Sequence, residues 1–129
     1  MTSTNFKIMI KKPKPIFDLN ERNQYFFDQL CDHIDKLEAI DGIMLSVMAV
    51  NMGILSITLK QMSDSGAVDL AQDGSMNFTV YYSTIKDLYA SLIDYADGYY
   101  MSIEDVDQLL KDCDIIFPPA LKRLLYENT

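Results

Sequence analysis

One stretch of the chain, ADGYYMSIED, has part of the spacing of a calcium-binding loop. Such a loop presents oxygen-bearing side chains at positions 1, 3 and 5, a glycine at position 6 and a glutamate at position 12. If Gly98 takes position 6, Glu104 falls at position 12, but Ile93 and Tyr95 fall at positions 1 and 3. Neither of these residues carries a carboxylate, so we exclude a calcium site. We interpret the stretch as a loop between two helices, with Gly98 ending the first of them.

Residues that could hold zinc or act as nucleophiles are few and poorly spaced. The chain has one histidine, His33, and two cysteines, Cys31 and Cys113. Cys31 and His33 are two positions apart on a predicted helix, where their side chains point about 200° away from each other and cannot share one ion. The chain has no G-x-S-x-G turn and no glycine-rich phosphate loop. We therefore predict no metal, no cofactor and no enzymatic activity; a small enzyme that uses carboxylates is kept as a third hypothesis.

Tyrosines and acidic residues gather in the second half of the chain. Tyrosine supplies a large contact area at low entropic cost and is common at the energetic centres of protein interfaces. Carboxylates around such tyrosines suit a partner with a basic surface. We predict a partner-binding surface made of eight residues that we expect to be exposed: Tyr81, Asp94, Asp97, Tyr99, Tyr100, Glu104, Asp105 and Asp107.

The net charge of the 129-residue chain is −8, and it is unevenly distributed. Residues 1–14 hold four lysines and no acid, which leaves 7 basic residues against 19 acidic ones, a net charge of −12, for the remainder. A body this acidic repels nucleic acid and anionic membrane surfaces, so we expect neither as a direct partner.

The location of the protein is predicted from features that the sequence lacks. We expect no membrane-spanning helix, because no apolar run approaches the roughly 20 residues that one needs. The first residues do not have the charged-then-apolar pattern of a signal peptide. Two cysteines are few for a small secreted domain. We expect a cytoplasmic protein, in the host cell cytoplasm if its source is a virus.

The apolar pattern predicts strands in the first two thirds of the chain. In residues 5–12 apolar and polar side chains alternate, which indicates an edge strand. Residues 43–61 are apolar without a clear period and contain Asn51-Met52-Gly53, so we predict two strands around a tight turn. Residues 75–83 alternate again and predict another strand, with a short strand at 67–70 between them.

Helices are predicted on both sides of these strands. Apolar residues at helical spacing indicate a helix within residues 18–41, capped by Asn20. Three further helices are expected at 84–96, at 102–113 with Ser102 as its cap, and from Pro118-Pro119 onward.

These elements predict an α+β fold. An antiparallel sheet of three to four main strands would be covered by an N-terminal helix and two to three C-terminal helices. We expect one domain over residues 1–129, in which residues 1–15 form an edge strand and a basic arm rich in proline and lysine, 18–41 a helix, 43–82 an antiparallel meander and 84–126 a helical region.

The leading functional hypothesis is a non-catalytic, acidic protein-binding module. Small acidic chains without catalytic motifs are typical of phage anti-defence proteins, including anti-CRISPRs, and of immunity proteins that neutralise toxins. We expect an inhibitor that occludes the basic groove of a nuclease or another enzyme that handles nucleic acid. The alternative is an assembly subunit or a chaperone-like adaptor that self-associates, for example as a homodimer, or binds a client.

Overall fold

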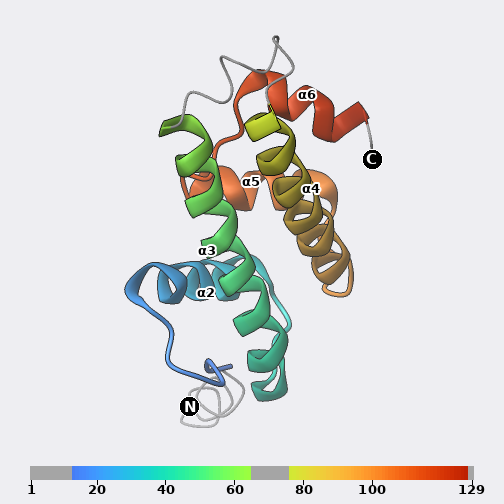
Figure 1. The fold of residues 1–129 in the computed structure, drawn as a ribbon. Helices are drawn as coiled ribbons and strands as arrows, with labels where there is room; N and C mark the ends of the chain where they lie inside the picture. The colour runs from blue at the N-terminus through green and yellow to red at the C-terminus, as the bar shows by residue number, and fades with distance from the viewer. Residues whose placement is uncertain (1–12, 65–75, 128–129) are drawn as a thin grey trace, which may run out of the picture.

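The computed structural model describes residues 13–64 and 76–127, and these residues form a helical fold. They form five α-helices, with one 3₁₀ turn before the longest helix, and Figure 1 shows how the helices are arranged. The elements are α2 (Glu21–His33), η1 (Ala39–Asp41), α3 (Gly42–Asp64), α4 (Met76–Asp97), α5 (Ile103–Asp112) and α6 (Pro119–Glu127).

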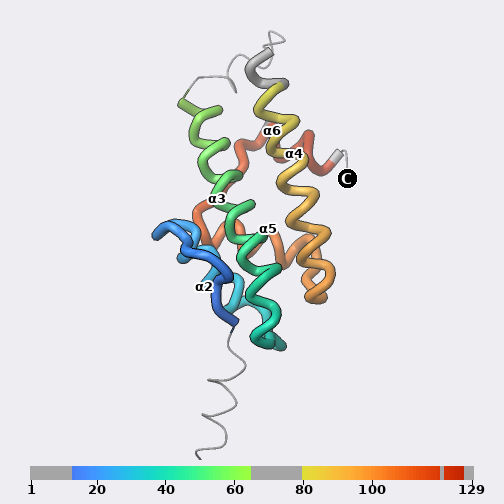
Figure 2. Tube along the Cα trace, turned by 60° about the horizontal axis from the view of Figure 1, so that its bottom comes forward, coloured from blue at the N-terminus to red at the C-terminus, as the bar shows by residue number. Residues whose placement is uncertain are grey.

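The two long helices, α3 and α4, lie side by side and run in opposite directions (Figure 1). Helix α2 crosses behind α3, α5 crosses behind both long helices, and α6 lies near the end at which α4 begins. Figure 2, which views the molecule from another direction, also shows α3 and α4 side by side. The core lies where these layers meet, and each helix contributes a fully buried side chain to it: Leu30, Met52, Tyr89, Leu109 and Leu121.

The predicted α+β fold is wrong, because the described residues contain no strand and the fold is predominantly all-α. The predicted meander over 43–82 is replaced by the whole of α3 and the first part of α4. Helix α3 has apolar residues both on the face that packs against the core and on the opposite face, so its sequence lacks the polar side that marks a surface helix. That lack of periodicity led us to predict strands buried on both faces.

Gly53 was interpreted as part of a turn, but it lies inside α3. A side chain at this position would collide with the side-chain amide oxygen of Asn23 on α2. The glycine therefore allows α2 to approach α3 closely, and the helix continues through it. Gly42, at the first position of α3, likewise leaves room for the main-chain carbonyl of Lys14, with which a side chain would collide.

Of the three remaining strand predictions, one is wrong and two concern residues outside the described ranges. The strand expected over 75–83 is wrong, since Met76 begins α4 and the helix runs on to Asp97. Its β-branched and aromatic residues favour a strand locally, but packing against α3 outweighs that preference. The strands predicted at 5–12 and 67–70 lie outside the described residues.

The helix predictions are closer to the structure. Helices α5 and α6 are confirmed, α5 with the predicted cap at Ser102 and α6 with Pro119 at its first position. The helix predicted over 18–41 has its expected cap at Asn20 but ends at His33. The residues after His33 form an extended connection and the 3₁₀ turn η1, and this connection becomes one wall of the site described below.

One segment, Ala39–Asp64, is long and apolar enough to cross a membrane by length and composition. More than half of its most apolar window is buried inside the protein, as in an ordinary core helix. The segment is therefore only weak evidence for a membrane role.

Candidate functional site

An open hollow lies between the α2–α3 connection and the turn that joins α4 to α5. Its volume is about 1050 Å³. We call it the acid–tyrosine hollow, because four carboxylates and two tyrosines line it: Asp35, Glu38, Asp41, Asp105, Tyr99 and Tyr100. Lys36 and His33 are also in its lining. Three of these residues, Tyr99, Tyr100 and Asp105, belong to the surface predicted from the sequence.

The turn after α4 holds Tyr100 out into solvent. The amide of Tyr100 donates to the carbonyl of Asp97 (3.0 Å), and that of Met101 donates to Ala96 (3.1 Å), which is the Schellman pattern of a helix end. Tyr100 takes the left-handed position of this motif, with φ 62°, where glycine is the usual residue. Helix α4 ends at Asp97, just before the predicted Gly98, but the left-handed position that closes it is taken by Tyr100, which is 97% exposed.

Tyr99 ties this turn to the opposite wall of the hollow. Its hydroxyl donates to Asp41 Oδ1 across 3.2 Å. Burial, together with the nearby Asp41 carboxylate, raises the pKa of Tyr99 to about 12. The hydroxyl therefore keeps its proton at neutral pH and remains a donor in this contact.

The wall formed by the α2–α3 connection was missed at the sequence level. The other oxygen of Asp41, Oδ2, accepts a hydrogen bond from the amide of Glu38 (2.7 Å), which fixes the carboxylate at the start of α3. Asp35 and Glu38 are exposed beside it. We had placed all three acids on a helix that was expected to run to residue 41. The reciprocal spacing of Glu38 and Asp41 is that of a capping box and could have indicated a helix start there.

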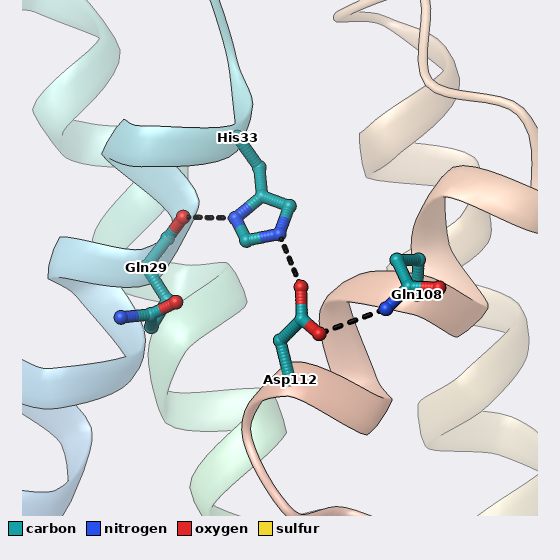
Figure 3. Close-up of polar contacts among 4 residues, drawn as sticks. All are labelled: Gln29, His33, Gln108 and Asp112. Carbon is teal, nitrogen blue, oxygen red and sulfur yellow. Dashed lines mark hydrogen bonds and ion pairs between the residues drawn. The ribbon is translucent and has the colours of Figure 1, made fainter.

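His33 is one of the residues that line the hollow, and it connects α2 to α5 through Asp112 (Figure 3). Its Nδ1 is 2.8 Å from the carbonyl of Gln29, and its Nε2 is 3.1 Å from Asp112 Oδ2. The second oxygen of Asp112 accepts a hydrogen bond from the side-chain amide of Gln108 (2.8 Å). These contacts from Gln108 and then His33 lower the pKa of Asp112.

Comparison of the chain with protein-family models, with curated proteins and with solved structures found no match.

Two of the predicted residues, Glu104 and Asp107, line a different and smaller cavity between α5 and α6. Its volume is about 410 Å³. Asp107 accepts hydrogen bonds from the hydroxyls of Tyr89 (2.7 Å) and Tyr126 (2.5 Å), so it joins α4, α5 and α6. Both carboxylate oxygens are used in holding the fold, and Asp107 is better described as a structural residue than as part of a free binding surface. We missed Tyr89, although a buried tyrosine at helical spacing needs an acceptor for its hydroxyl.

The last three predicted residues line neither cavity. Asp94 and Asp97 are exposed on the final turns of α4. Tyr81 is half-buried and packs against the core near the other end of this helix, about 24 Å from Asp97 at 1.5 Å per residue. The structure thus separates Tyr81 from the tyrosines with which we had grouped it.

The chemistry available in the acid–tyrosine hollow is recognition of positive charge. No group of three or more histidine, cysteine, aspartate or glutamate side chains within the described ranges has the arrangement of a metal site. Asp41 and Asp105 use their oxygens to accept hydrogen bonds from neighbouring main-chain amides. Asp35, Glu38 and Tyr100 are exposed and face solvent beside them. The hollow therefore offers fixed negative charge and one prominent aromatic ring.

Proposed function

We propose that this protein is a non-catalytic binding module whose acid–tyrosine hollow receives a basic segment of a protein partner. One observation carries the proposal: Tyr100 is held almost fully exposed, in a left-handed conformation, at the edge of a hollow lined by four carboxylates. A left-handed conformation costs a residue with a side chain about 1–2 kcal/mol. A bulky side chain in such a position is a reason to look for function.

Arginine is the side chain that this arrangement fits best. A guanidinium group donates to carboxylates through two parallel hydrogen bonds and stacks on an aromatic face. Asp35 and Glu38 supply exposed carboxylates, and Tyr100 supplies the ring. Lysine would gain the charge attraction but not the planar contacts.

Enzymes that handle nucleic acid are the partner class that we favour. Their grooves are lined with arginine and lysine to hold phosphate, and a chain with a net charge of −8 is attracted to such surfaces. The protein would then act as a competitive inhibitor, with its carboxylates and Tyr100 occupying the groove in place of nucleic acid.

Calorimetric titration with an octa-arginine peptide tests whether the hollow is the binding site. Tyr100→Ala should weaken binding at least about tenfold, as expected for an aromatic anchor. Asp35→Lys should weaken it at least about threefold more than Asp94→Lys, which changes the net charge equally but lies outside the hollow. Equal effects of the two charge reversals would show diffuse attraction and overturn the proposal.

The class of partner needs a separate experiment. Protein retained from the native host lysate at low and at high salt should be identified by mass spectrometry, with the Tyr100→Ala variant as the control. We expect a nuclease or other nucleic-acid enzyme that the wild type retains, that high salt releases and that the variant does not retain. If the proteins retained through Tyr100 have no role with nucleic acid, the inhibitor part of the proposal is wrong.

A second candidate function, self-assembly, is favoured by the outer side of α3. Ile43, Ile54 and Ile57 are 51%, 44% and 42% exposed, and Val47 and Val50 lie half-buried between them. We call these five residues the α3 outer stripe; their spacing alternates between four and three residues, as in the contact seam of paired helices.

Sedimentation equilibrium distinguishes the candidates. An assembly subunit should be a dimer or larger, should remain so at high salt, and should become a monomer when Ile54 and Ile57 are both changed to lysine. The control changes Ile103 at the start of α5 and Ile116 in the α5–α6 connection, two exposed isoleucines outside the stripe. A wild-type protein that is a monomer at every concentration would remove this candidate.

A further inference from the structure

The single histidine of the chain is placed so that only its protonated form satisfies both of its contacts. Nδ1 faces the main-chain carbonyl of Gln29, and Nε2 faces the carboxylate of Asp112. Both of these oxygens accept hydrogen bonds and neither can donate one. A neutral imidazole has one N–H and can make only one of the two bonds, whereas the imidazolium makes both.

Only the contact with Asp112 joins elements that are far apart in the chain. Gln29 lies in α2 with His33 itself, while Asp112 is the last residue of α5, 79 positions away from His33. His33 is also the residue from which the α2–α3 connection departs. Protonation of His33 therefore fixes the beginning of that connection against the end of α5.

From this geometry we infer that His33 is a pH-dependent latch that sets the shape of the acid–tyrosine hollow. With the imidazolium in place, the wall that carries Asp35, Glu38 and Asp41 is held in the arrangement seen here. When His33 loses its proton, it either loses the bond to Asp112 or keeps it as a weaker bond from a neutral imidazole, so this wall is less firmly held. The regulatory part of the inference rests on the proposed function, because it assumes that the hollow binds a basic segment.

Other charged groups lie around this site. Asp112 contacts the ring from α5, and Asp105 lines the same hollow from the start of that helix. Asp35, Glu38 and Asp41 line it from the α2–α3 connection, with Lys36 as the cation among them. Lys111, next to Asp112 on α5, is a second nearby cation, and the acidic side chains around the imidazole still outnumber the basic ones.

A double-mutant cycle measured at two pH values tests the latch without any ligand. His33→Gln, Asp112→Asn and the double variant are unfolded with heat at pH 5.5 and at pH 8. At pH 5.5 we expect each single variant to lower the melting temperature by about 2–4 °C and the double variant to lower it by little more than either one. At pH 8 this coupling should be lost or at least halved, because most imidazoles are neutral there. Coupling that is absent at pH 5.5, or equal at both pH values, would overturn the latch.

The effect on the hollow is measured with the octa-arginine peptide over the same pH range. The wild type should bind at least about threefold more tightly at pH 5.5 than at pH 8, since the fixed wall loses less conformational entropy on binding. His33→Gln should bind with an affinity that changes less than twofold between the two pH values. A wild-type affinity that is unchanged or lower at pH 5.5 would refute the regulation, while the double-mutant cycle would still report on the latch itself. If the peptide does not bind at either pH, the proposed function fails and the cycle remains decisive for the latch.

Discussion

At the scale of single residues, Asp107 shows how a carboxylate that looks like part of an acidic surface can instead hold the fold. Asp107 accepts a hydrogen bond from the hydroxyl of Tyr89. The buried ring of Tyr89 packs edge-to-face on Phe117, with 5.3 Å between the ring centres. It also accepts the hydroxyl of the exposed Tyr126. The same side chain therefore links three helices.

Replacing Asp107 by asparagine should destabilise the protein, because the amide side of asparagine cannot accept a hydrogen bond. We expect a loss of about 1–3 kcal/mol in the free energy of unfolding, the cost of leaving a polar group without its partner. Urea denaturation followed by circular dichroism measures it. Tyr126→Phe is the control and should cost less than about 1 kcal/mol, since Asp107 keeps its bond to Tyr89. Equal stability of Asp107→Asn and the wild type would show that the two hydroxyl contacts contribute nothing.

The raised pKa values of Tyr99 and Tyr126 predict that the protein loses stability at alkaline pH. Burial and the nearby Asp41 raise the pKa of Tyr99 to about 12, and the hydrogen bond to Asp107 raises that of Tyr126 to about 12. Because each pKa is higher in the folded state, this stabilisation is complete below the usual tyrosine value of about 10 and is lost as pH rises toward 12. Urea denaturation at intervals between pH 9 and 12 should show stability falling over this range, and less steeply in Tyr126→Phe. An identical slope in the variant would contradict the assignment.

Tyr100 allows stability and binding to be changed in opposite directions. Tyr100→Gly relieves the left-handed conformation but increases the freedom of the unfolded chain, so we expect a net stabilisation of about 0.5 kcal/mol. Binding of the octa-arginine peptide should fall at least about tenfold in the same variant. Thermal unfolding and calorimetry measure the two effects. A variant that is clearly less stable would show that the Tyr100 side chain packs in the folded protein.

Only the part of the site that is formed by residues close together in the chain could be predicted from the sequence. Tyr99, Tyr100 and Asp105 are close in the chain, so a single local turn brings them together, and their composition alone indicated a surface. Asp35 and Asp41 reach the same hollow only because α2 and α5 pack together. A contact across so many residues depends on tertiary structure, and local patterns contain no record of it.

At the scale of elements, the helices with one polar face were predicted and the helix without one was not. Val106, Leu109 and Leu110 in α5 are buried at helical spacing, while Glu104 and Gln108 face solvent. This contrast identifies a helix from sequence. In α3 the α3 outer stripe removes the contrast, and the segment was interpreted as strands. The apolar residues that misled the prediction are the same ones that favour self-assembly.

The close contact between Gly42 and Lys14 predicts that replacing this helical glycine by alanine lowers the stability of the protein, whereas such a change usually raises it. Gly42 has a helical φ of −55°, so Gly42→Ala would normally stabilise the helix by about 0.5–1 kcal/mol. Here the added methyl group would collide with the main-chain carbonyl of Lys14, which cannot rotate away. We expect a loss of about 1–3 kcal/mol, measured by urea denaturation. Stabilisation by Gly42→Ala would show that the segment before α2 is not held against α3.

At the scale of the whole molecule, the net charge of −8 makes diffuse attraction the main competitor of the proposed site. Any acidic body attracts a basic peptide at low salt, and affinity alone does not show where the peptide binds. Exposed carboxylates such as Asp87 and Asp94 on α4 would take part in diffuse binding as readily as those of the hollow. The position of the bound peptide on the protein, and not its affinity, therefore distinguishes binding in the acid–tyrosine hollow from diffuse attraction.

The most direct measurement is an amide chemical-shift titration of isotope-labelled protein with octa-arginine at physiological salt. We expect the shifted amides to cluster in residues 33–41 and 98–105, on the two walls of the acid–tyrosine hollow, and we expect Tyr100→Ala to remove most of these shifts. An octa-glutamate peptide should produce none. Shifts spread along the exposed face of α4, or unchanged in the Tyr100→Ala variant, would contradict the claim that the hollow is the binding site.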